Sequence, residues 1–292
     1  MQVKSFYNPF EVTIEENSPP KSISYPEEYD NSDKVNILCT QINLSQAKQS
    51  KLIKEWCEVL PSLDSIKYIW FFSKVPQLLF DALCSMKKLE GVYIKWSGIE
   101  DLENIKNLSK LKYLHIGSSS KVVCITPLKY LTKLKCLELE SFKKIVDLTP
   151  LSTLSQLEGL AITGSFSGNQ KIDSLKPLEE LKSLEWLNLM GTVVKDASLE
   201  PITKLEKLKY LSLAYLYPVE EMACVVAKLT STQHGITAYQ SLDDTICKKC
   251  ANDVLILPTG KGKRSFCPQC HPEKLTKLVD DFQKHVQRYL DE

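Results

Sequence analysis

The chain has 292 residues, of which 43% are hydrophobic and 25% are charged, a composition that excludes disordered and fibrous proteins. Its 37 basic and 36 acidic residues give a net charge of +1, so bulk charge does not attract it to nucleic acid or to an anionic membrane. No apolar stretch approaches the roughly 20 residues of a membrane span, and the N-terminus lacks the apolar region of a signal peptide. We therefore expect a cytoplasmic protein with no membrane partner.

Residues 1–34 form the first predicted segment. They contain four prolines and seven acidic against three basic residues, which favours an extended or partly disordered leader unless it runs along the flank of the fold. Residues 35–62 follow as an N-terminal cap, with a strand over 35–39 and a helix over about 45–59. The helix places its apolar side chains on one face: Leu52, Ile53, Trp56, Val59 and Leu60.

A frame of the form L-x-x-L-x-x-L-x-L recurs through residues 63–216. Its seven copies start at Leu63, Met86, Leu108, Leu131, Leu154, Leu181 and Leu205. Successive starts are 23, 22, 23, 23, 27 and 24 residues apart, a period typical of a solenoid of stacked coils. Between the frames, apolar residues spaced three apart, such as Ile99, Leu102 and Ile105, predict a tight helical turn on the outer side of each coil.

These frames resemble the leucine-rich repeat family in its short form of about 22 residues, as in bacterial internalins. The resemblance covers roughly residues 60–216. It implies an α/β solenoid, a horseshoe with a parallel concave sheet and helical caps, and it suggests a bacterial origin. The family usually places Asn or Cys after the strand, whereas Phe142 and Leu216 stand there in two repeats. Because neither side chain forms hydrogen bonds, we expect a less regular coil at those two positions.

Side chains that alternate with the strand leucines are predicted to point out of the concave surface. The candidate partner-binding residues on or just beyond these positions are Tyr68, Trp70, Tyr93, Trp96, Tyr113, His115, Trp186, Tyr210 and Tyr215. Exposed aromatic side chains in such number are typical of surfaces that bind a protein partner. The alternative is that the rings stack laterally and only stabilise the sheet.

The same face offers no arrangement typical of an enzyme. We interpret His115 as a polar contact and Cys136 as a thiol without an evident activator. Glu138 and Glu140 are interpreted as part of a solvated face and not as an acid–base pair. The sequence therefore predicts a non-enzymatic protein-recognition module.

Residues 217–242 are predicted to form a C-terminal cap, whose helix opens at Pro218. Four of the ten cysteines then follow in pairs within residues 243–272: Cys247, Cys250, Cys267 and Cys270. Each C-x-x-C turn presents two thiolates to one ion, and two such turns complete a tetrahedron, so we predict a structural Zn²⁺. With predicted strands over 253–257 and 264–266, this segment resembles a zinc ribbon. A redox dithiol is the alternative for one C-x-x-C taken alone.

The predicted ribbon carries a local excess of positive charge. Its basic residues are Lys248, Lys249, Lys261, Lys263 and Arg264. A nucleic-acid-associated protein that uses these side chains for contact is therefore the alternative function. Residues 273–292 predict an amphipathic helix whose apolar face docks on the ribbon, on the end of the solenoid or on a second chain, which leaves the oligomeric state open.

Overall fold

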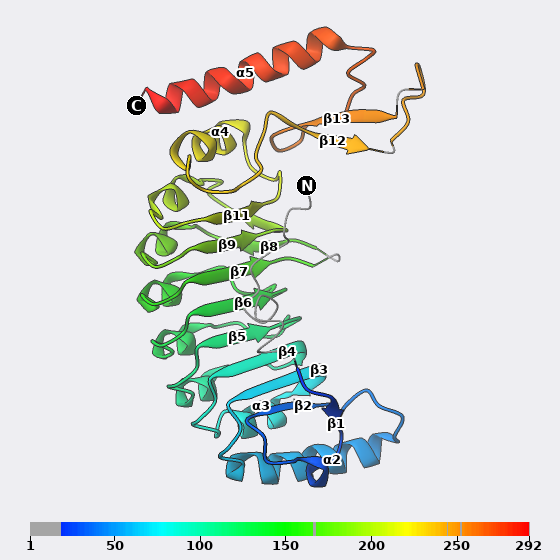
Figure 1. Cartoon of the computed structure of the whole chain (residues 1–292), viewed down its shortest axis with the longest axis vertical. Helices are drawn as coiled ribbons and strands as arrows, with labels where there is room; N and C mark the ends of the chain where they lie inside the picture. Colours follow the sequence, from blue (N-terminus) through cyan, green and yellow to red (C-terminus); the bar gives the residue numbers. More distant parts are fainter. Residues whose placement is uncertain (1–18, 166–167, 244, 252, 292) are drawn as a thin grey trace.

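The computed structural model describes residues 19–165, 168–243, 245–251 and 253–291, and its main element is one long parallel sheet. Its nine strands follow the chain order: β1 (Ser22–Ile23), β2 (Lys34–Ile37), β3 (Tyr68–Pro76), β4 (Gly91–Gly98), β5 (Tyr113–Ile116), β6 (Cys136–Glu140), β7 (Gly159–Thr163), β9 (Trp186–Leu189) and β11 (Tyr210–Leu213). Figure 1 shows these strands stacked along the long axis of a curved solenoid. The predicted α/β solenoid with a parallel sheet is confirmed.

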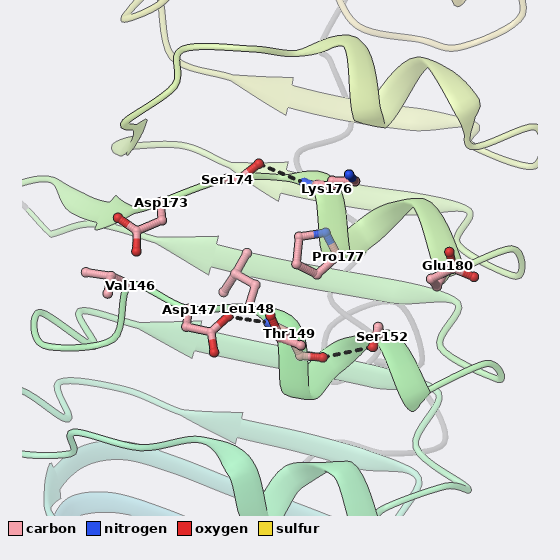
Figure 2. Close-up of a pocket in the computed structure, with 10 residues that line it drawn as sticks. All are labelled: Val146, Asp147, Leu148, Thr149, Ser152, Asp173, Ser174, Lys176, Pro177 and Glu180. Carbon is pink, nitrogen blue, oxygen red and sulfur yellow. Dashed lines mark hydrogen bonds between the residues drawn. The ribbon is translucent and has the colours of Figure 1, made fainter.

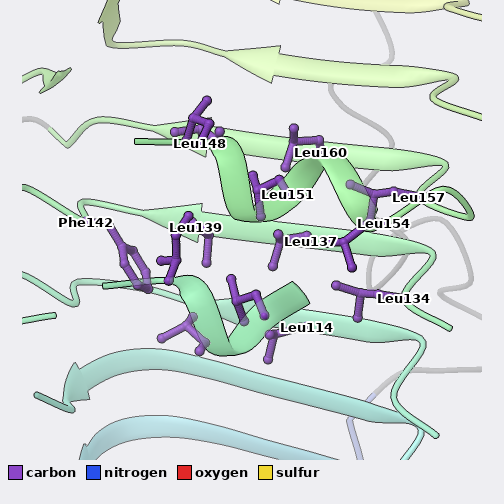
Figure 3. Packing of buried hydrophobic residues seen from close by; sticks show 14 of the residues in the cluster. Leu114, Leu134, Leu137, Leu139, Phe142, Leu148, Leu151, Leu154, Leu157 and Leu160 are labelled. Carbon is purple, nitrogen blue, oxygen red and sulfur yellow. The ribbon is translucent and has the colours of Figure 1, made fainter. Parts of the chain in front are cut away.

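From β4 onward, the outer side of the coils is formed by short 3₁₀ helices, as the three-residue spacing predicts. These helices are η3 (Glu103–Asn107), η4 (Thr126–Tyr130), η5 (Thr149–Thr153), η6 (Lys176–Glu180) and η7 (Glu200–Lys204). Each of the last four has a proline in its first turn. Proline lacks a backbone N–H, but amides in the first turn have no hydrogen-bond partner within the helix, so no hydrogen bond is lost. Leucines of the frame fill the space between strand and turn, layer upon layer (Figure 3).

The core explains why the frame needs branched aliphatic side chains. Leu134, Leu137 and Leu139 of one coil and Leu157 and Leu160 of the next are all 2% exposed or less. Each coil buries its apolar edge only against its neighbours, so the solenoid holds together by the repetition itself. Phe142 does not disturb this packing, because its ring is 1% exposed within the same core (Figure 3).

The N-terminal cap is larger than the sequence predicts. Helix α2 (Gln46–Val59) begins where expected, with Ser45 as its N-cap, and helix α3 (Gln77–Leu83) packs beside it. Short helices η1 (Pro26–Glu28) and η2 (Leu60–Ser62) flank them. Residues 22–34 follow the alternative left open for the leader, because β1 pairs with β2 at the edge of the sheet and the Trp56 indole donates a hydrogen bond to the Ser24 carbonyl over 2.7 Å. The remainder of that prediction, over residues 1–18, lies outside the described residues.

The longest repeat carries an extra small sheet. Strands β8 (Gln170–Ile172) and β10 (Thr192–Val194) pair in parallel beside the main sheet, and β8 lies in the repeat of 27 residues. Gln170 is 1% exposed, and its side-chain amide donates to the Ile145 carbonyl over 2.8 Å. Strand β8 is therefore anchored to the coil before it.

The C-terminal end is covered by two helices. Helix α4 (Val219–Lys228) follows Pro218 as predicted, and helix α5 (Pro272–Leu290) crosses the end of the molecule beyond it (Figure 1). Phe282 and Val286 of α5 belong to the same buried cluster as the repeats. Of the three docking surfaces open to this helix, the end of the solenoid is therefore the one it uses. Among the described residues, no helix is long and apolar enough to cross a membrane.

Candidate functional site

Strand register places the predicted outward side chains in two rows across the sheet. One row is Tyr68, Gly91, Tyr113, Cys136, Gly159, Trp186 and Tyr210, and the other is Trp70, Tyr93, His115, Glu138, Ala161, Asn188 and Ser212. The aliphatic positions between them, such as Leu114 and Leu137, are fully buried on the opposite side. Because strand side chains alternate, both rows lie on the concave face.

The prediction that all the concave aromatic side chains are exposed is wrong. Trp70 is 2% and Trp186 is 4% exposed, whereas Trp96 is 48% and Tyr210 is 46% exposed. The reason at Trp186 is lateral packing, because a Cβ on Gly159 would lie 3.2 Å from its ring and 3.3 Å from the Cys136 sulfur. Trp186 therefore fills the space left by a glycine in the neighbouring strand, as in the stacking alternative.

The other candidates fall between these extremes. Tyr68, Tyr93 and Tyr113 are half-buried, and the Tyr68 ring lies 6.3 Å from that of Trp70, centroid to centroid. Tyr215 packs against the solenoid core and is therefore not an open concave residue. Trp96, beyond the main register of β4, has the Lys95 ammonium 5.9 Å from its ring centroid.

Four side chains form a continuous line of contacts across strands β3 to β6, which we call the concave strip: Phe72, Tyr93, His115 and Glu138. The ring centroids of Phe72 and Tyr93 lie 5.3 Å apart, and those of Tyr93 and His115 lie 4.3 Å apart in a stacked arrangement. His115 Nδ1 then lies 2.9 Å from Glu138 Oε2. Phe72, 39% exposed, is absent from the sequence prediction because the repeat frame ends one residue earlier, although strand alternation continues to it.

Glu138 differs from its predicted solvated state. The residue is 9% exposed, as is His115, so this acid and this imidazole form a buried pair on the sheet surface. Cys136 lies two residues earlier, and its burial, together with the charges of Glu138 and Glu158, raises the pKa of its thiol well above the ordinary value. A thiol in that state is a poor nucleophile.

The four paired cysteines converge on one point at the far end of the chain. Their sulfur atoms all lie within 4.8 Å of one another, with Cys247 and Cys270 3.9 Å apart and Cys250 and Cys267 3.5 Å apart. Four sulfurs about 2.3 Å from a central zinc ion would be about 3.8 Å from each other, so the cluster fits tetrahedral Zn²⁺. In the described part of the chain, it is the only group of three or more Cys, His, Asp or Glu ligands.

The two C-x-x-C turns have the same backbone construction. The amide of Ala251 donates to the Cys247 carbonyl over 2.9 Å, and the amide of His271 donates to the Cys267 carbonyl over 3.1 Å. Backbone N–H groups of Lys249 and Cys250 lower the pKa of the Cys247 thiol. At Cys267, desolvation raises the pKa of the thiol. Hydrogen bonds from the Cys270 amide and from the neighbouring thiols outweigh this and lower the pKa to about 6. At Cys270, the hydrogen bond with Cys250, together with desolvation and the other two thiols, raises the pKa to about 12. Each turn therefore has one cysteine, Cys247 or Cys267, that favours the thiolate, the form that binds a metal.

Strands and loops around the cluster attach it to the C-terminal cap. Strands β12 (Tyr239–Asp243) and β13 (Val254–Pro258) form an antiparallel hairpin, and Phe266 makes a bridge to Ile256. The loop after β13 then reaches the cap, where the Lys261 amide donates to the Tyr217 carbonyl over 2.8 Å. The sequence predicts a strand over 264–266, but the structure has only the single bridge at Phe266 there. Strand β12 begins at Tyr239, within the range 217–242 that the sequence predicts for the cap.

All five basic side chains of the predicted nucleic-acid contact are exposed: Lys248, Lys249, Lys261, Lys263 and Arg264. None of them makes an ion pair with another residue that the structure describes. The segment therefore presents positive charge to solvent, although the chain as a whole is nearly neutral.

A shallow hollow of about 420 Å³ lies between η5 and η6, away from the concave strip (Figure 2). Its polar groups already serve the local backbone: Asp147 accepts a hydrogen bond from the Thr149 amide over 2.8 Å, and Ser174 accepts one from the Lys176 amide over 3.2 Å. These contacts begin the two helical turns. The hollow is a groove between consecutive coils, and the side chains of Asp173, Lys176 and Glu180 also line it.

Comparison with solved structures identifies the fold. An internalin (inlF) from Listeria monocytogenes matches with a TM-score of 0.53 and 24% identity over 69% of this chain and 54% of its own chain. An internalin C2 (inlC2) from the same organism has a TM-score of 0.48 and 24% identity over 60% and 72% of the two chains. A leucine-rich-repeat protein from Leptospira interrogans has a TM-score of 0.46 and 18% identity over 61% and 50%.

The matched region spans about half the length of the inlF chain. No protein-family profile matches the sequence, and no curated protein matches it. The likeness to inlF therefore concerns the arrangement of strands and turns, and this arrangement is that of a leucine-rich-repeat solenoid.

Proposed function

We propose that the chain is a non-enzymatic recognition module that binds a partner protein on the concave face of its sheet. The observation that carries this proposal is the concave strip with its exposed end, where Phe72 is 39% exposed beside Tyr93 and Trp96 is 48% exposed on the next strand. Aromatic side chains lose little rotamer entropy when they are fixed in an interface, and they are the usual anchors of protein interfaces. Leaving them in water has a cost that a partner removes.

The test uses side chains that are exposed and therefore dispensable for folding. A Phe72→Ala, Trp96→Ala double variant is expected to lose more than about 2 kcal/mol of partner-binding free energy while its unfolding midpoint stays close to that of the parent. Affinity capture from an extract of the source organism, followed by quantitative mass spectrometry, measures the loss. Trp70 is unsuitable for this purpose, because truncating a 2% exposed ring destabilises the protein itself.

Tyr130→Ala is the matched control. Tyr130 is an aromatic residue of η4, 54% exposed, and it lies on the outer side of the coil. Capture that survives in the Tyr130 variant and disappears in the double variant supports the proposal. Equal capture by the double variant and the parent would place the interface elsewhere.

We further propose that the four cysteines hold one structural zinc ion. Four thiolates complete the tetrahedron and leave no position for a substrate or an activated water, so the ion would organise the segment and not catalyse. The donor set and the spacing of the sulfurs support this assignment. Elemental analysis of the purified chain should give one zinc per chain, falling to a small fraction of that value in a Cys250→Ser, Cys267→Ser variant.

A second candidate function is nucleic-acid contact by the segment around the cysteines, favoured by its five exposed and unpaired basic side chains. A Lys261→Ala, Lys263→Ala, Arg264→Ala variant should then bind labelled RNA or DNA more weakly and with a smaller salt dependence, each lost phosphate contact lowering the slope by about 1. Fluorescence anisotropy over a salt series measures both quantities. No binding by the parent at low salt would exclude this function.

A further inference from the structure

The acid at the end of the concave strip has one oxygen that no residue in the described part of the fold satisfies. Glu138 Oε2 lies 2.9 Å from His115 Nδ1, but Glu138 Oε1 is buried and has no hydrogen-bond partner among the described residues. The residue as a whole is 9% exposed. An unsatisfied buried carboxylate oxygen is costly for a folded protein, so its presence calls for a ligand.

Among the residues that the structure describes, no lysine or arginine forms an ion pair with Glu138. In the described part of the chain, its sole ion-pair partner is His115. An ionised carboxylate only accepts hydrogen bonds, so the His115 contact uses a proton on Nδ1 and leaves Glu138 Oε1 without a donor among the described residues. What the site lacks is therefore a cation with hydrogen-bond donors.

Neighbouring side chains favour a planar cation. On one side of Glu138 in the row, the His115 ring continues into the stacked ring of Tyr93. On the other side stands Ala161, whose methyl group is the smallest side chain in this part of the row. A guanidinium group donates to a carboxylate from its edge and stacks on flat rings with its face, and it is more weakly hydrated than an ammonium group.

A metal ion and a catalytic role fit these residues less well. The pair provides only two ligating residues, and His115 Nδ1 already faces Glu138. Cys136, the nearest thiol along the strand, is 2% exposed. The remaining chemistry of the strip is recognition.

We propose that Glu138 and His115 form a subsite for an arginine side chain of the partner protein, whose guanidinium group donates to Glu138 Oε1. This inference rests on the proposed function, because it specifies the chemistry of a partner on the concave face. It also predicts an unusual combination: a Glu138→Gln variant, which removes the buried charge and keeps the shape, is at least as stable as the parent but loses arginine binding.

The experiment follows the imidazole ring signals of the full-length protein by NMR. The chain has only four histidines, so a His115→Gln variant assigns the His115 signals. The probe is arginine acetylated at its α-amino group and amidated at its carboxyl group, so that the guanidinium group is its only charge. The matching citrulline derivative has the same shape without the charge.

The arginine derivative should shift the His115 signals in a saturable way, and the citrulline derivative should bind about tenfold more weakly or not at all. Glu138→Gln should weaken arginine binding by about tenfold or more. Glu140→Gln, an equal charge change two residues along the same strand, is the control and should leave the affinity near that of the parent. Thermal unfolding of both variants checks that each one folds.

Three outcomes of the binding measurements would each overturn the subsite. They are no His115 shift with the arginine derivative, equal binding of the citrulline derivative, or undiminished binding in the folded Glu138→Gln variant. Deletion of residues 1–18 gives a further test. If the deletion shifts the His115 signals and the arginine derivative does not, the carboxylate of Glu138 serves the chain's own N-terminal residues, and the subsite is overturned as well. If Glu138→Gln leaves partner capture intact while the Phe72 and Trp96 variant abolishes it, the subsite fails and the recognition function stands.

Discussion

At the scale of single residues, two glycines show how closely neighbouring coils approach. A Cβ on Gly117 would lie 2.4 Å from the Lys95 carbonyl oxygen, a backbone atom of the preceding coil. A Cβ on Gly159 would meet only side chains, the Trp186 ring and the Cys136 sulfur. Backbone atoms of packed strands move little, whereas side-chain atoms such as the Trp186 ring and the Cys136 sulfur can shift by a few tenths of an ångström. The two positions should therefore respond differently to the same added methyl group.

We predict that Gly117→Ala lowers the free energy of unfolding by about 3 kcal/mol, whereas Gly159→Ala lowers it by about 1 kcal/mol or less. Urea unfolding followed by circular dichroism measures both values. A Gly159→Ala, Cys136→Ala double variant should regain part of the loss, because it removes the sulfur 3.3 Å from the new atom. Equal destabilisation by the two alanines would contradict this account of the close contacts.

The face of the sheet toward which a strand side chain points could be predicted from the sequence, but the exposed fraction of that side chain could not. Alternation around the frame leucines places Trp70, Glu138 and Trp186 on the concave side, where strand register puts them. Their burial depends on which side chains lie beside them in the neighbouring strands, a relation that no single repeat contains. Glu138 is the clearest case, since its partner His115 comes from the coil before it.

At the scale of elements, the starts of the helices could be predicted from the sequence better than the short strand β1 at the edge of the sheet. Ser45 and Pro218 have the side-chain oxygen and the fixed φ that suit helix starts, and α2 and α4 begin directly after them. Strand β1 has only two residues, and its place at the sheet edge depends on pairing with β2. Local sequence carries little signal for so short a strand.

Helix α5 is the element whose docking most affects the stability of the solenoid end. Its Phe282 is 3% exposed in the common core, whereas Leu290, on the same helix, is 54% exposed. We predict that Phe282→Ala lowers the free energy of unfolding by about 3–5 kcal/mol and that Leu290→Ala changes it by less than about 0.5 kcal/mol. Urea unfolding compares the two variants. A small effect at Phe282 would mean that α5 contributes little to the cap.

At the scale of the whole molecule, one core runs from the first strand of the sheet to the last helix. It includes Val35 near one end and Val286 near the other, so the solenoid and its caps form a continuous apolar unit. Ion pairs between successive coils, such as Lys112–Glu90 and Lys209–Glu185, lie just before the starts of the strands and are partly exposed. Each contributes little to stability. The cohesion of the solenoid therefore comes from the leucine layers.

The segment around the cysteines has a different basis for its order. Among the described residues between β12 and α5, the buried apolar side chains besides the loop that touches the cap are Ile256, Pro258 and Cys267, and none of them belongs to the common core. So small an apolar interior cannot hold a hairpin and two turns alone, and a bound metal would contribute most of the folding free energy there. Removing the metal should therefore loosen this segment before it affects the coils.

We predict that a strong zinc chelator increases hydrogen exchange by residues 239–270 to near the rate of an unfolded chain, while strands β5 to β7 keep their protection. Hydrogen exchange with mass spectrometry reads both regions in one sample. Helix α5 should show an intermediate change, because it follows the cysteines directly but has its own contacts with α4. Adding zinc back should restore protection, and adding magnesium, which prefers oxygen ligands, should not. Equal and simultaneous loss of protection in the coils and around the cysteines would show that the metal holds the whole molecule together and not one segment of it.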